Sequence, residues 1–212
     1  MTRHGHRTAV EVEYGRMARG YDARWRAYLH RSLEATLPHV PALSGQRVLD
    51  VGCGTGMLLH ALAARGAGQH LVGVDRTMEM LAVARAAEPE GRSAHWLRGD
   101  AGAVPLHDGV CDVVVSTSAL HYVRDTAAVL REWRRVLRPG GRMVITDWCG
   151  DAWTMRGLDV VLRIVDPAHH RVMTVEGLTE AVRAAGFTVS HATRTAAGRF
   201  WQLMTVVATR DA

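Results

Sequence analysis

Three glycines at alternate positions, directly after an apolar run that holds an acid, constrain this chain more than any other feature. Residues 47–56 read Arg-Val-Leu-Asp-Val-Gly-Cys-Gly-Thr-Gly. The apolar run suits a buried strand, and Gly52, Gly54 and Gly56 suit the turn after it, because glycine accepts positive φ and has no Cβ to hold a ligand away. Met57 then begins an apolar helix whose first N–H groups would point back at the turn.

Acidic residues also follow two later strand-like segments. Residues 70–75 end at Asp75, and residues 95–97 lead into Arg98-Gly99-Asp100-Ala101. An acid at the tip of the second strand can accept hydrogen bonds from both ribose hydroxyls of a nucleoside. A dinucleotide-binding fold is one alternative. However, its fingerprint has a third glycine three residues after the second, where this chain has Met57.

These segments together resemble the class I S-adenosylmethionine-dependent methyltransferases. The loop matches that family's pattern of a hydrophobic residue followed by Asp-x-Gly-x-Gly-x-Gly, and residues 136–145, with their Arg-Pro-Gly-Gly turn, resemble its entry into the fifth strand. The resemblance covers roughly residues 10–212. It implies an α/β fold with a Rossmann-like, doubly wound, seven-stranded and mostly parallel sheet. The implied strand order is 3-2-1-4-5-7-6, with strand 7 antiparallel and an N-terminal helical lid.

The residue patterns predict where the elements lie. Alternating strands and helices are typical of a largely parallel sheet with right-handed crossovers. Residues 1–40 are expected to form the lid or extension, and residues 41–212 the methyltransferase domain. Helices are expected at 8–36, 57–65, 77–87, 125–137, 151–166 and 174–185. Strands are expected at 47–51, 70–75, 93–97, 111–116, 142–148, 187–194 and 200–208, the last two as a hairpin around Gly198.

The resemblance implies that the chain binds S-adenosyl-L-methionine and releases S-adenosyl-L-homocysteine. In such a sheet the ligand lies at the carboxyl ends of the strands, where the topology switches. The loop glycines would pack against the methionine moiety, Asp75 would hold the ribose, and Asp100 with Ala101 would hold the adenine. The residues expected to bind the cofactor are Asp50, Gly52, Gly54, Gly56, Asp75, Arg76, Met78, Asp100, Ala101, Ser116, Tyr14 and Tyr21.

Four of these residues allow a choice of role. Asp50 is expected to orient the loop through backbone N–H groups rather than to touch the methyl group. Met78 would cover a face of the adenine or pack in the core of its helix. Tyr14 and Tyr21 lie in the pattern Tyr-x6-Tyr-Asp-x2-Trp, which resembles the family's N-terminal helix. They would bind the cofactor carboxylate or the substrate, or else anchor that helix to the core.

Methyl transfer from a sulfonium is an in-line displacement with a good leaving group, so its main requirement is to align the nucleophile with the methyl carbon. A base is needed only where the acceptor must lose a proton. His121, in the segment after the fourth strand, is the candidate catalytic base, since an unperturbed histidine has a pKa of about 6.5. Its alternative role is to cap or pack the following helix.

Aromatic and histidine residues after the fifth strand are candidates for a substrate pocket. Trp148 and Trp153 would favour an apolar or aromatic acceptor, although both could equally be structural. His169 and His170 follow Pro167, beside the helix expected to shape substrate access. Adjacent histidines cannot share one helix face, so they make a poor metal pair and we expect no metal site.

The formal net charge of +5 could indicate a nucleic-acid partner. All 26 basic residues are arginines, however, and they are scattered; the densest group, at 131–138, is typical of a solvated helix face. No apolar run approaches the ~20 residues of a membrane span, and the N-terminus lacks a secretory signal. The three cysteines show no paired spacing. We therefore expect a cytoplasmic monomer or homodimer with neither nucleic-acid nor membrane partners.

The sequence thus predicts an enzyme that moves a methyl group from S-adenosyl-L-methionine to oxygen, nitrogen, sulfur or carbon of a small molecule. The segment Ser116-Thr-Ser lacks the Asn/Asp-Pro-Pro-Tyr/Phe motif of nucleic-acid enzymes that methylate amino groups. An RNA or protein methyltransferase is the alternative within this class. A catalytically idle, cofactor-binding partner subunit is the alternative outside it.

Overall fold

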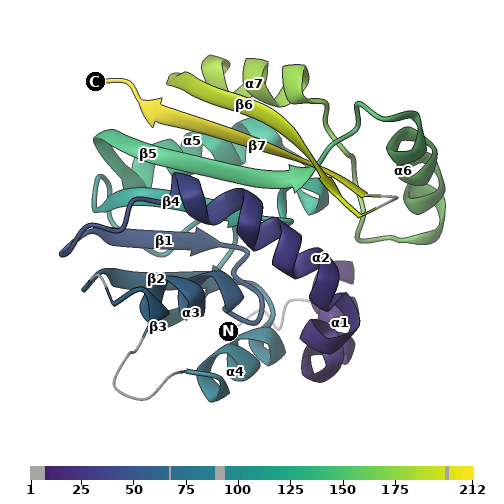
Figure 1. The fold of residues 1–212 in the computed structure, drawn as a ribbon, viewed down its shortest axis with the longest axis horizontal. Coiled ribbons are helices and arrows are strands. Elements are labelled where there is room, and N and C mark those ends of the chain that lie inside the picture. The colour runs from purple at the N-terminus through teal and green to yellow at the C-terminus, as the bar shows by residue number, and fades with distance from the viewer. Residues whose placement is uncertain (1–7, 67, 89–93, 199–200) are drawn as a thin grey trace, which may run out of the picture.

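A seven-stranded sheet in the order β3-β2-β1-β4-β5-β7-β6 forms the centre of the computed structural model, which describes residues 8–66, 68–88, 94–198 and 201–212 (Figure 1). Neighbouring strands from β3 to β5 run parallel, whereas β7 pairs antiparallel with both β5 and β6. The expected order and the antiparallel seventh strand are therefore confirmed. The strands are β1 Arg47–Val51, β2 His70–Asp75, β3 His95–Arg98, β4 Cys111–Thr117, β5 Leu137–Trp148, β6 Phe187–Ala197 and β7 Trp201–Arg210.

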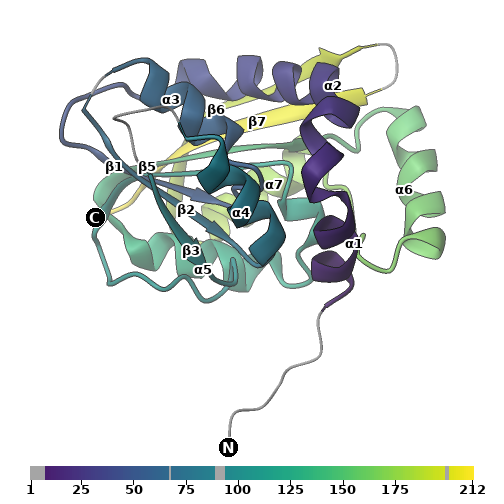
Figure 2. The ribbon, with the colours of Figure 1, turned by 90° about the horizontal axis from the view of Figure 1, so that it is seen from below.

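Helices cover both faces of the sheet. Figure 2 shows α2 and α3 on one side of the strands, with α5 and α7 on the other. None of the helices in the described ranges is long and apolar enough to span a bilayer. The α-helices are α1 Ala9–Met17, α2 Tyr21–Thr36, α3 Met57–Ala64, α4 Met78–Ala86, α5 Thr126–Val136, α6 Trp153–Val165 and α7 Val175–Ala184. Short 3-10 helices are η1 Ala18–Gly20, η2 Leu37–His39 and η3 Leu120–Tyr122.

Successive side chains of the central strands point to opposite faces of the sheet, so the core forms two layers. On β1, Leu49 and Val51 face a cluster that includes the fully buried Trp133 of α5, while Val48 faces the cluster built on α3 and α4. This alternation follows from the two-residue period of a strand, and it makes both faces apolar, as a sheet covered on both sides requires. All three cysteines are free and buried.

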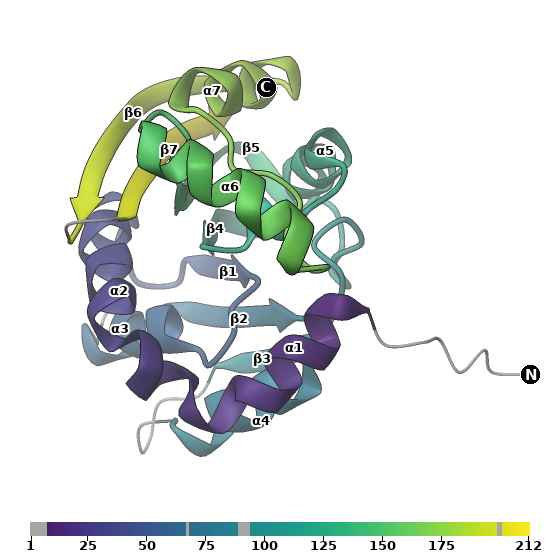
Figure 3. The same cartoon turned by 90° about the vertical axis from the view of Figure 1, so that its right-hand side faces the viewer.

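The sheet's topology creates a crevice beside β1. The chain runs from β1 outward through β2 to β3 and then returns to β4, which pairs with the other edge of β1. The connections after β1 and β4 therefore leave the sheet toward opposite faces, and their divergence opens the crevice at the carboxyl ends. In Figure 3, which looks onto these ends, α1 and α6 lie in front of the sheet.

The predicted helix over 8–36 is wrong as a single element. It breaks at η1, so that α1 crosses the carboxyl ends while α2 packs on the sheet, where Thr36 Oγ1 lies 2.8 Å from Thr146 Oγ1. Gly20 stands at the break with φ −111° and ψ 0°, which departs from helical geometry. Residues 1–7 of the expected lid lie outside the described residues.

The boundary between α5 and β5 also differs from the prediction. The helix was expected to reach 137 and the strand to begin at 142, but β5 begins at Leu137, directly after α5. Cys111 pairs with Leu137 and Val113 with Arg142, so residues 138–141 bulge out between two paired positions. The pattern of helix and turn residues could not show that β5 pairs with β4 both before and after the glycines.

The remaining boundaries agree within a few residues. Thr174 caps α7 as expected, since its Oγ1 accepts from the Gly177 N–H at 3.0 Å. The hairpin of β6 and β7 is confirmed, with Gly198 at φ +88°. Residue 93 of the third predicted strand and residue 200 of the last lie outside the described residues.

Substitution of Gly56 by alanine should lower the free energy of unfolding by about 2–4 kcal/mol. Gly56 has φ +79°, and a Cβ there would lie 2.4 Å from Trp96 Cη2. Urea denaturation measures the loss. The matched control is Gly54→Ala, where φ is +53° but no atom lies within 4 Å, so only the backbone cost of about 1 kcal/mol applies. Equal losses in the two variants would contradict the packing role of Gly56.

Candidate active site at the carboxyl ends of the strands

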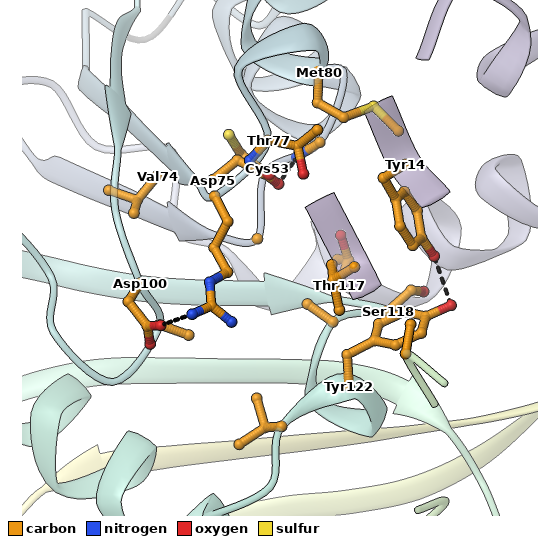
Figure 4. A pocket seen from close by; sticks show the side chains of 18 of the residues that line it. Tyr14, Cys53, Val74, Asp75, Thr77, Met80, Asp100, Thr117, Ser118 and Tyr122 are labelled. Atoms are coloured by element: carbon orange, nitrogen blue, oxygen red, sulfur yellow. Dashed lines mark hydrogen bonds and ion pairs between the residues drawn. The ribbon is translucent and has the colours of Figure 1, made fainter. Parts of the chain in front are cut away.

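A cavity of about 690 Å³ lies in the crevice, within the range of ligand pockets in general (Figure 4). Its lining comes from the loops after β1, β2, β3 and β4 and from α1, which lies across it. Asp75, Arg76, Asp100, Arg124, Asp125 and His170 supply charged or titratable groups, and much of the remaining lining is apolar. The predicted location at the topological switch is therefore where the structure has its cavity.

The glycine loop has the positive φ values that its sequence predicted. Gly52, Gly54 and Gly56 have φ of +75°, +53° and +79°. Gly52 and Gly54 line the cavity, and a Cβ on Gly52 would lie 2.5 Å from that of Ala119 in the loop after β4. Gly56 is not among the lining residues, because it faces Trp96 instead. Two of the three glycines therefore expose backbone to a ligand, and the third permits close packing.

Asp75 fixes this loop from the neighbouring strand. Its Oδ2 accepts from the Gly54 N–H at 2.9 Å, and its Oδ1 accepts from the Thr77 N–H at 2.8 Å. Burial raises the pKa of the Asp75 carboxyl, while these backbone donors act in the opposite direction. The side chain also lines the cavity, so the lone pairs left on its oxygens are available to hydroxyl donors of a ligand.

The expected adenine-binding residues lie at the far end of the cavity. Arg76 Nη2 forms an ion pair with Asp100 Oδ2 at 2.6 Å, and Asp100 Oδ1 accepts from the Gly102 N–H at 2.7 Å. Ala101 lines the cavity, and its carbonyl accepts from Trp133 Nε1 at 3.0 Å. The structure thus brings the residues predicted after β2 and β3 together along one wall.

The expectation for Asp50 requires a correction. Its carboxylate is buried, and within the described residues neither oxygen has a hydrogen-bond partner. Asp75, not Asp50, accepts the loop N–H group. Burial raises the pKa of Asp50 to about 8, with a further contribution from the negative charge of Asp75. Because an unpaired buried charge is costly, Asp50 is uncharged over most of the range below that value.

Two more predicted cofactor residues lie away from the cavity. Met78 is 44% exposed and does not line it, whereas Met80, two residues later on α4, does. Ser116 is buried inside the sheet, where its hydroxyl donates to the Val51 carbonyl at 2.8 Å. The residues after it, Thr117 and Ser118, line the cavity in its place.

The predicted lid tyrosines do line the cavity. Tyr14 Oη donates to Tyr122 Oη at 2.6 Å, and the rings of Tyr14 and Tyr21 lie 5.6 Å apart. Burial raises the pKa of Tyr21 to about 12 and also raises the pKa of Tyr14, so both phenols stay protonated. Two polar contacts also tie α1 and α2 to the sheet. Thr55 Oγ1 of the glycine loop donates to Asp22 Oδ1 at 2.7 Å, and Arg98 Nη2 pairs with Glu11 Oε1 at 2.9 Å.

His121 is packed behind the cavity rather than on its wall. Its ring stacks on Trp148 at 4.1 Å, and its Nδ1 lies 2.6 Å from Asp147 Oδ1. The side chain is 3% exposed, and Nε2 has no partner among the described residues. The carbonyl of His121 accepts from the backbone N–H groups of His170 and Arg171, which ties η3 to the segment after α6.

The four residues predicted to form a substrate pocket do not lie together in the structure. His170 lines the cavity and accepts from Arg124 Nε at 3.1 Å; burial, and then the Arg124 charge, lower its pKa. His169 is buried and pairs with Asp159 at 2.8 Å, outside the lining. Trp148 lies in an aromatic cluster with Tyr28, also outside the lining, and Trp153 is 83% exposed on α6. Within the described ranges, no group of three or more potential ligands is placed to hold a metal ion.

Sequence reasoning missed several lining residues, among them Thr77, Met80, Ser118 and Tyr122. Ser118 carried no signal in its residue type, although it is the one described non-glycine residue with positive φ, at +56°. Tyr122 could have been found, because it directly follows the His121 that was considered, in the same loop after β4.

Comparison with known proteins shows that this chain is similar to methyltransferases. A family described as a methyltransferase domain matches residues 49–145. An uncharacterized methyltransferase of Mycobacterium bovis is 34% identical over 84% of this chain and 70% of its own length. The demethylmenaquinone methyltransferase of Thermus thermophilus is 38% identical over 61% of this chain, and the malonyl-[acyl-carrier protein] O-methyltransferase of Pectobacterium atrosepticum is 36% identical over 66%. This chain spans only 56% and 53% of those two proteins.

Solved structures agree at the level of the fold. A chain from the complex between the Haloferax volcanii Trm112 methyltransferase activator and a methyltransferase has a TM-score of 0.80 and 21% identity, covering 98% of this chain and 100% of its own. Phosphoethanolamine N-methyltransferase 2 of Haemonchus contortus, solved with S-adenosyl-L-methionine, has a TM-score of 0.70 and 18% identity over 86% of this chain and 53% of its own.

Replacement of Asp50 by asparagine should flatten the pH dependence of stability between about pH 4 and pH 8. The folded-state pKa of about 8 lies above the ordinary aspartate value of 3.8, so the folded protein holds a proton that the unfolded chain releases. The wild type therefore loses free energy of unfolding as pH rises through this window, and the variant should not lose that part. Chemical denaturation at several pH values measures both slopes. Parallel slopes would mean that Asp50 is ionised in the folded protein.

Proposed function

Because the chain belongs to the class I S-adenosylmethionine-dependent methyltransferases, we propose that it transfers the methyl group of S-adenosyl-L-methionine to a small-molecule acceptor by in-line displacement. The observation that carries this proposal is the covered cavity at the switch point, with the glycine loop and Asp75 on one side and α1 across it. The cofactor's sulfonium is itself the leaving group, so the protein chiefly has to position the acceptor.

The cavity's polar groups suggest how the cofactor lies. We propose that its adenosine half occupies the end between Asp75 and Asp100, where a carboxylate can accept from the ribose hydroxyls. The methionine half would then lie along the exposed backbone of Gly52 and Gly54. That placement directs the methyl group toward the loop after β4, which closes the other end of the cavity.

A small acceptor suits the way the cavity is covered. Three contacts join α1 or α2 to different parts of the sheet's carboxyl edge. They are Thr55–Asp22, Arg98–Glu11 and Tyr14–Tyr122. A polymer substrate would have to displace this cover, whereas a small molecule can be enclosed by it. The relatives that act on demethylmenaquinone and on malonyl-[acyl-carrier protein] support an acceptor from small-molecule metabolism, but they do not select one.

We propose a structural role for His121 rather than the role of general base. Its ring is stacked on Trp148 and bonded to Asp147, behind residues that line the cavity. The acceptor would then either need no base or lose its proton before transfer.

Asp75→Ala should weaken binding of S-adenosyl-L-homocysteine by about 1–3 kcal/mol, because the ribose loses an acceptor and the glycine loop loses a support. Isothermal titration calorimetry measures the affinity. The matched control is Asp112→Ala. Asp112 lies near the amino end of β4, where it accepts from the Arg47 N–H at 2.8 Å and from Arg138 Nε at 2.6 Å. That variant should keep its affinity, and an unchanged affinity in Asp75→Ala would remove Asp75 from the ribose site.

Incubation of the purified protein with methyl-labelled S-adenosyl-L-methionine and an extract of its source cells should place label in the small-molecule fraction. Label in RNA or protein would instead support a macromolecular acceptor. If no label moves while S-adenosyl-L-homocysteine still binds, the chain is better described as a cofactor-binding partner subunit. Heat-treated protein is the control for chemical methylation.

A further inference from the structure

Two hydroxyl groups in the loop after β4 line the cavity, and each stands at the end of a chain of hydrogen bonds. Figure 4 shows Ser118 and Tyr122 near Tyr14, on the side of the cavity away from Asp100. Under the proposed placement of the cofactor, this is the end where the methyl group is presented. Their hydrogen-bond partners determine what these hydroxyls can still bind.

In the first chain, the direction of each hydrogen bond follows from the number of protons that each group can donate. Trp148 Nε1 can only donate, and it does so to Tyr28 Oη at 2.8 Å. Tyr28 is buried, and its remaining described hydrogen-bond partner is Ser118 Oγ, at short range. If Ser118 donated to Tyr28, the buried phenol proton of Tyr28 would be left without an acceptor, which is costly and rare for buried polar groups. Tyr28 therefore donates to Ser118, and the Ser118 proton remains free.

The second chain leads to the same result. Tyr14 Oη donates to Tyr122 Oη at 2.6 Å, so the phenol proton of Tyr122 has no acceptor in that pair. Burial raises the pKa of Tyr122, which keeps this proton on the oxygen. Each chain thus ends in a hydroxyl that has accepted one hydrogen bond and can donate another toward the cavity. A hydroxyl that accepts a hydrogen bond is also a better donor, since the chain polarises it.

The backbone of Ser118 is held in a position that an ordinary loop residue avoids. Its φ of +56° lies in the left-handed region, and its N–H donates to the Thr146 carbonyl at 2.8 Å. Left-handed geometry is unfavourable for a non-glycine residue, and such strain clusters at sites that bind ligands. Here it directs the serine side chain to Tyr28 and the cavity together.

We propose that the Ser118 and Tyr122 hydroxyls form a two-donor subsite for an electron-rich oxygen of the methyl acceptor, such as a phenolate, an enolate or a carbonyl. This inference rests on the proposed function and adds a substrate class to it. Two neutral donors suit an oxygen that carries partial or full negative charge, because they stabilise it without neutralising it. Trp148, Tyr28 and Tyr14 act as positioning residues behind this pair.

A phenolate probe tests the subsite without knowledge of the natural acceptor. The visible absorption band of 4-nitrophenolate shifts to shorter wavelength when its oxygen accepts hydrogen bonds from strong donors. The protein, saturated with S-adenosyl-L-homocysteine, should bind this probe above the probe's own pKa and shift its band. Ser118→Gly and Tyr122→Phe should each weaken probe binding about tenfold and reverse part of the shift. Glycine is used at 118 because it accepts the positive φ.

The matched control is Ser190→Ala, which removes a hydroxyl on β6 that lies outside the cavity lining and donates to the Val207 carbonyl at 3.3 Å; it should keep both the affinity and the shift. Tyr28→Phe should lose part of the shift while Ser118 is still present, and an unchanged shift there would overturn the first chain. A wild-type protein that leaves the probe unbound or unshifted overturns the subsite. So does a probe affinity that Ser118→Gly and Tyr122→Phe leave unchanged.

Calorimetry with S-adenosyl-L-homocysteine distinguishes a failure of the acceptor subsite from a failure of the proposed function. If both variants bind it as the wild type does, the hydroxyls serve the acceptor, as proposed. If they lose this affinity instead, the pair holds the carboxylate of the cofactor and the acceptor subsite is wrong. If the wild type itself does not bind S-adenosyl-L-homocysteine, the proposed function fails, whatever the probe shows.

Discussion

The carboxylate of Asp75 is the interaction on which the rest of the site depends. Its two oxygens accept from backbone N–H groups of the glycine loop after β1 and of the residue that precedes α4. One side chain at the end of β2 therefore fixes the relative position of two loops that must both face the ligand. The carbonyl of Val74 adds to this, since it accepts from the N–H groups of Gly52 and Cys53. A buried carboxylate is tolerated there because these donors offset part of its desolvation.

The parts of the fold that the sequence could predict are those set by local chemistry. Glycine at 52, 54 and 56 permits the positive φ observed there, and the apolar run before them suited a buried strand. The order of the sheet then followed from family resemblance and from the count of strands. Asp75 was predicted from its place at the end of the second strand and Asp100 from the family resemblance, and both line the cavity.

The site residues that the sequence could not predict depend on which way a side chain points, and that direction changes within one or two positions along the chain. Successive residues of a strand point to opposite faces, so Ser116 enters the sheet's interior at a position that residue type alone could not exclude. Two residues on a helix turn the side chain by about 200°, which separates the exposed Met78 from the lining Met80. Asp50 and His121 were assigned by residue chemistry, yet packing places both behind the surface that a ligand could reach.

The cap of α1 connects the cavity to the order of the chain's first helix. Thr8 forms a capping box with Glu11 and also lines the cavity, and Glu11 in turn pairs with Arg98 at the end of β3. A ligand that contacts Thr8 therefore binds best when α1 is fully formed. Reciprocity then requires that an occupied cavity protects this helix from fraying to the same extent that fraying weakens the ligand. The affinity of the ligand and the opening of the N-terminal helix are therefore linked properties of one equilibrium in this protein.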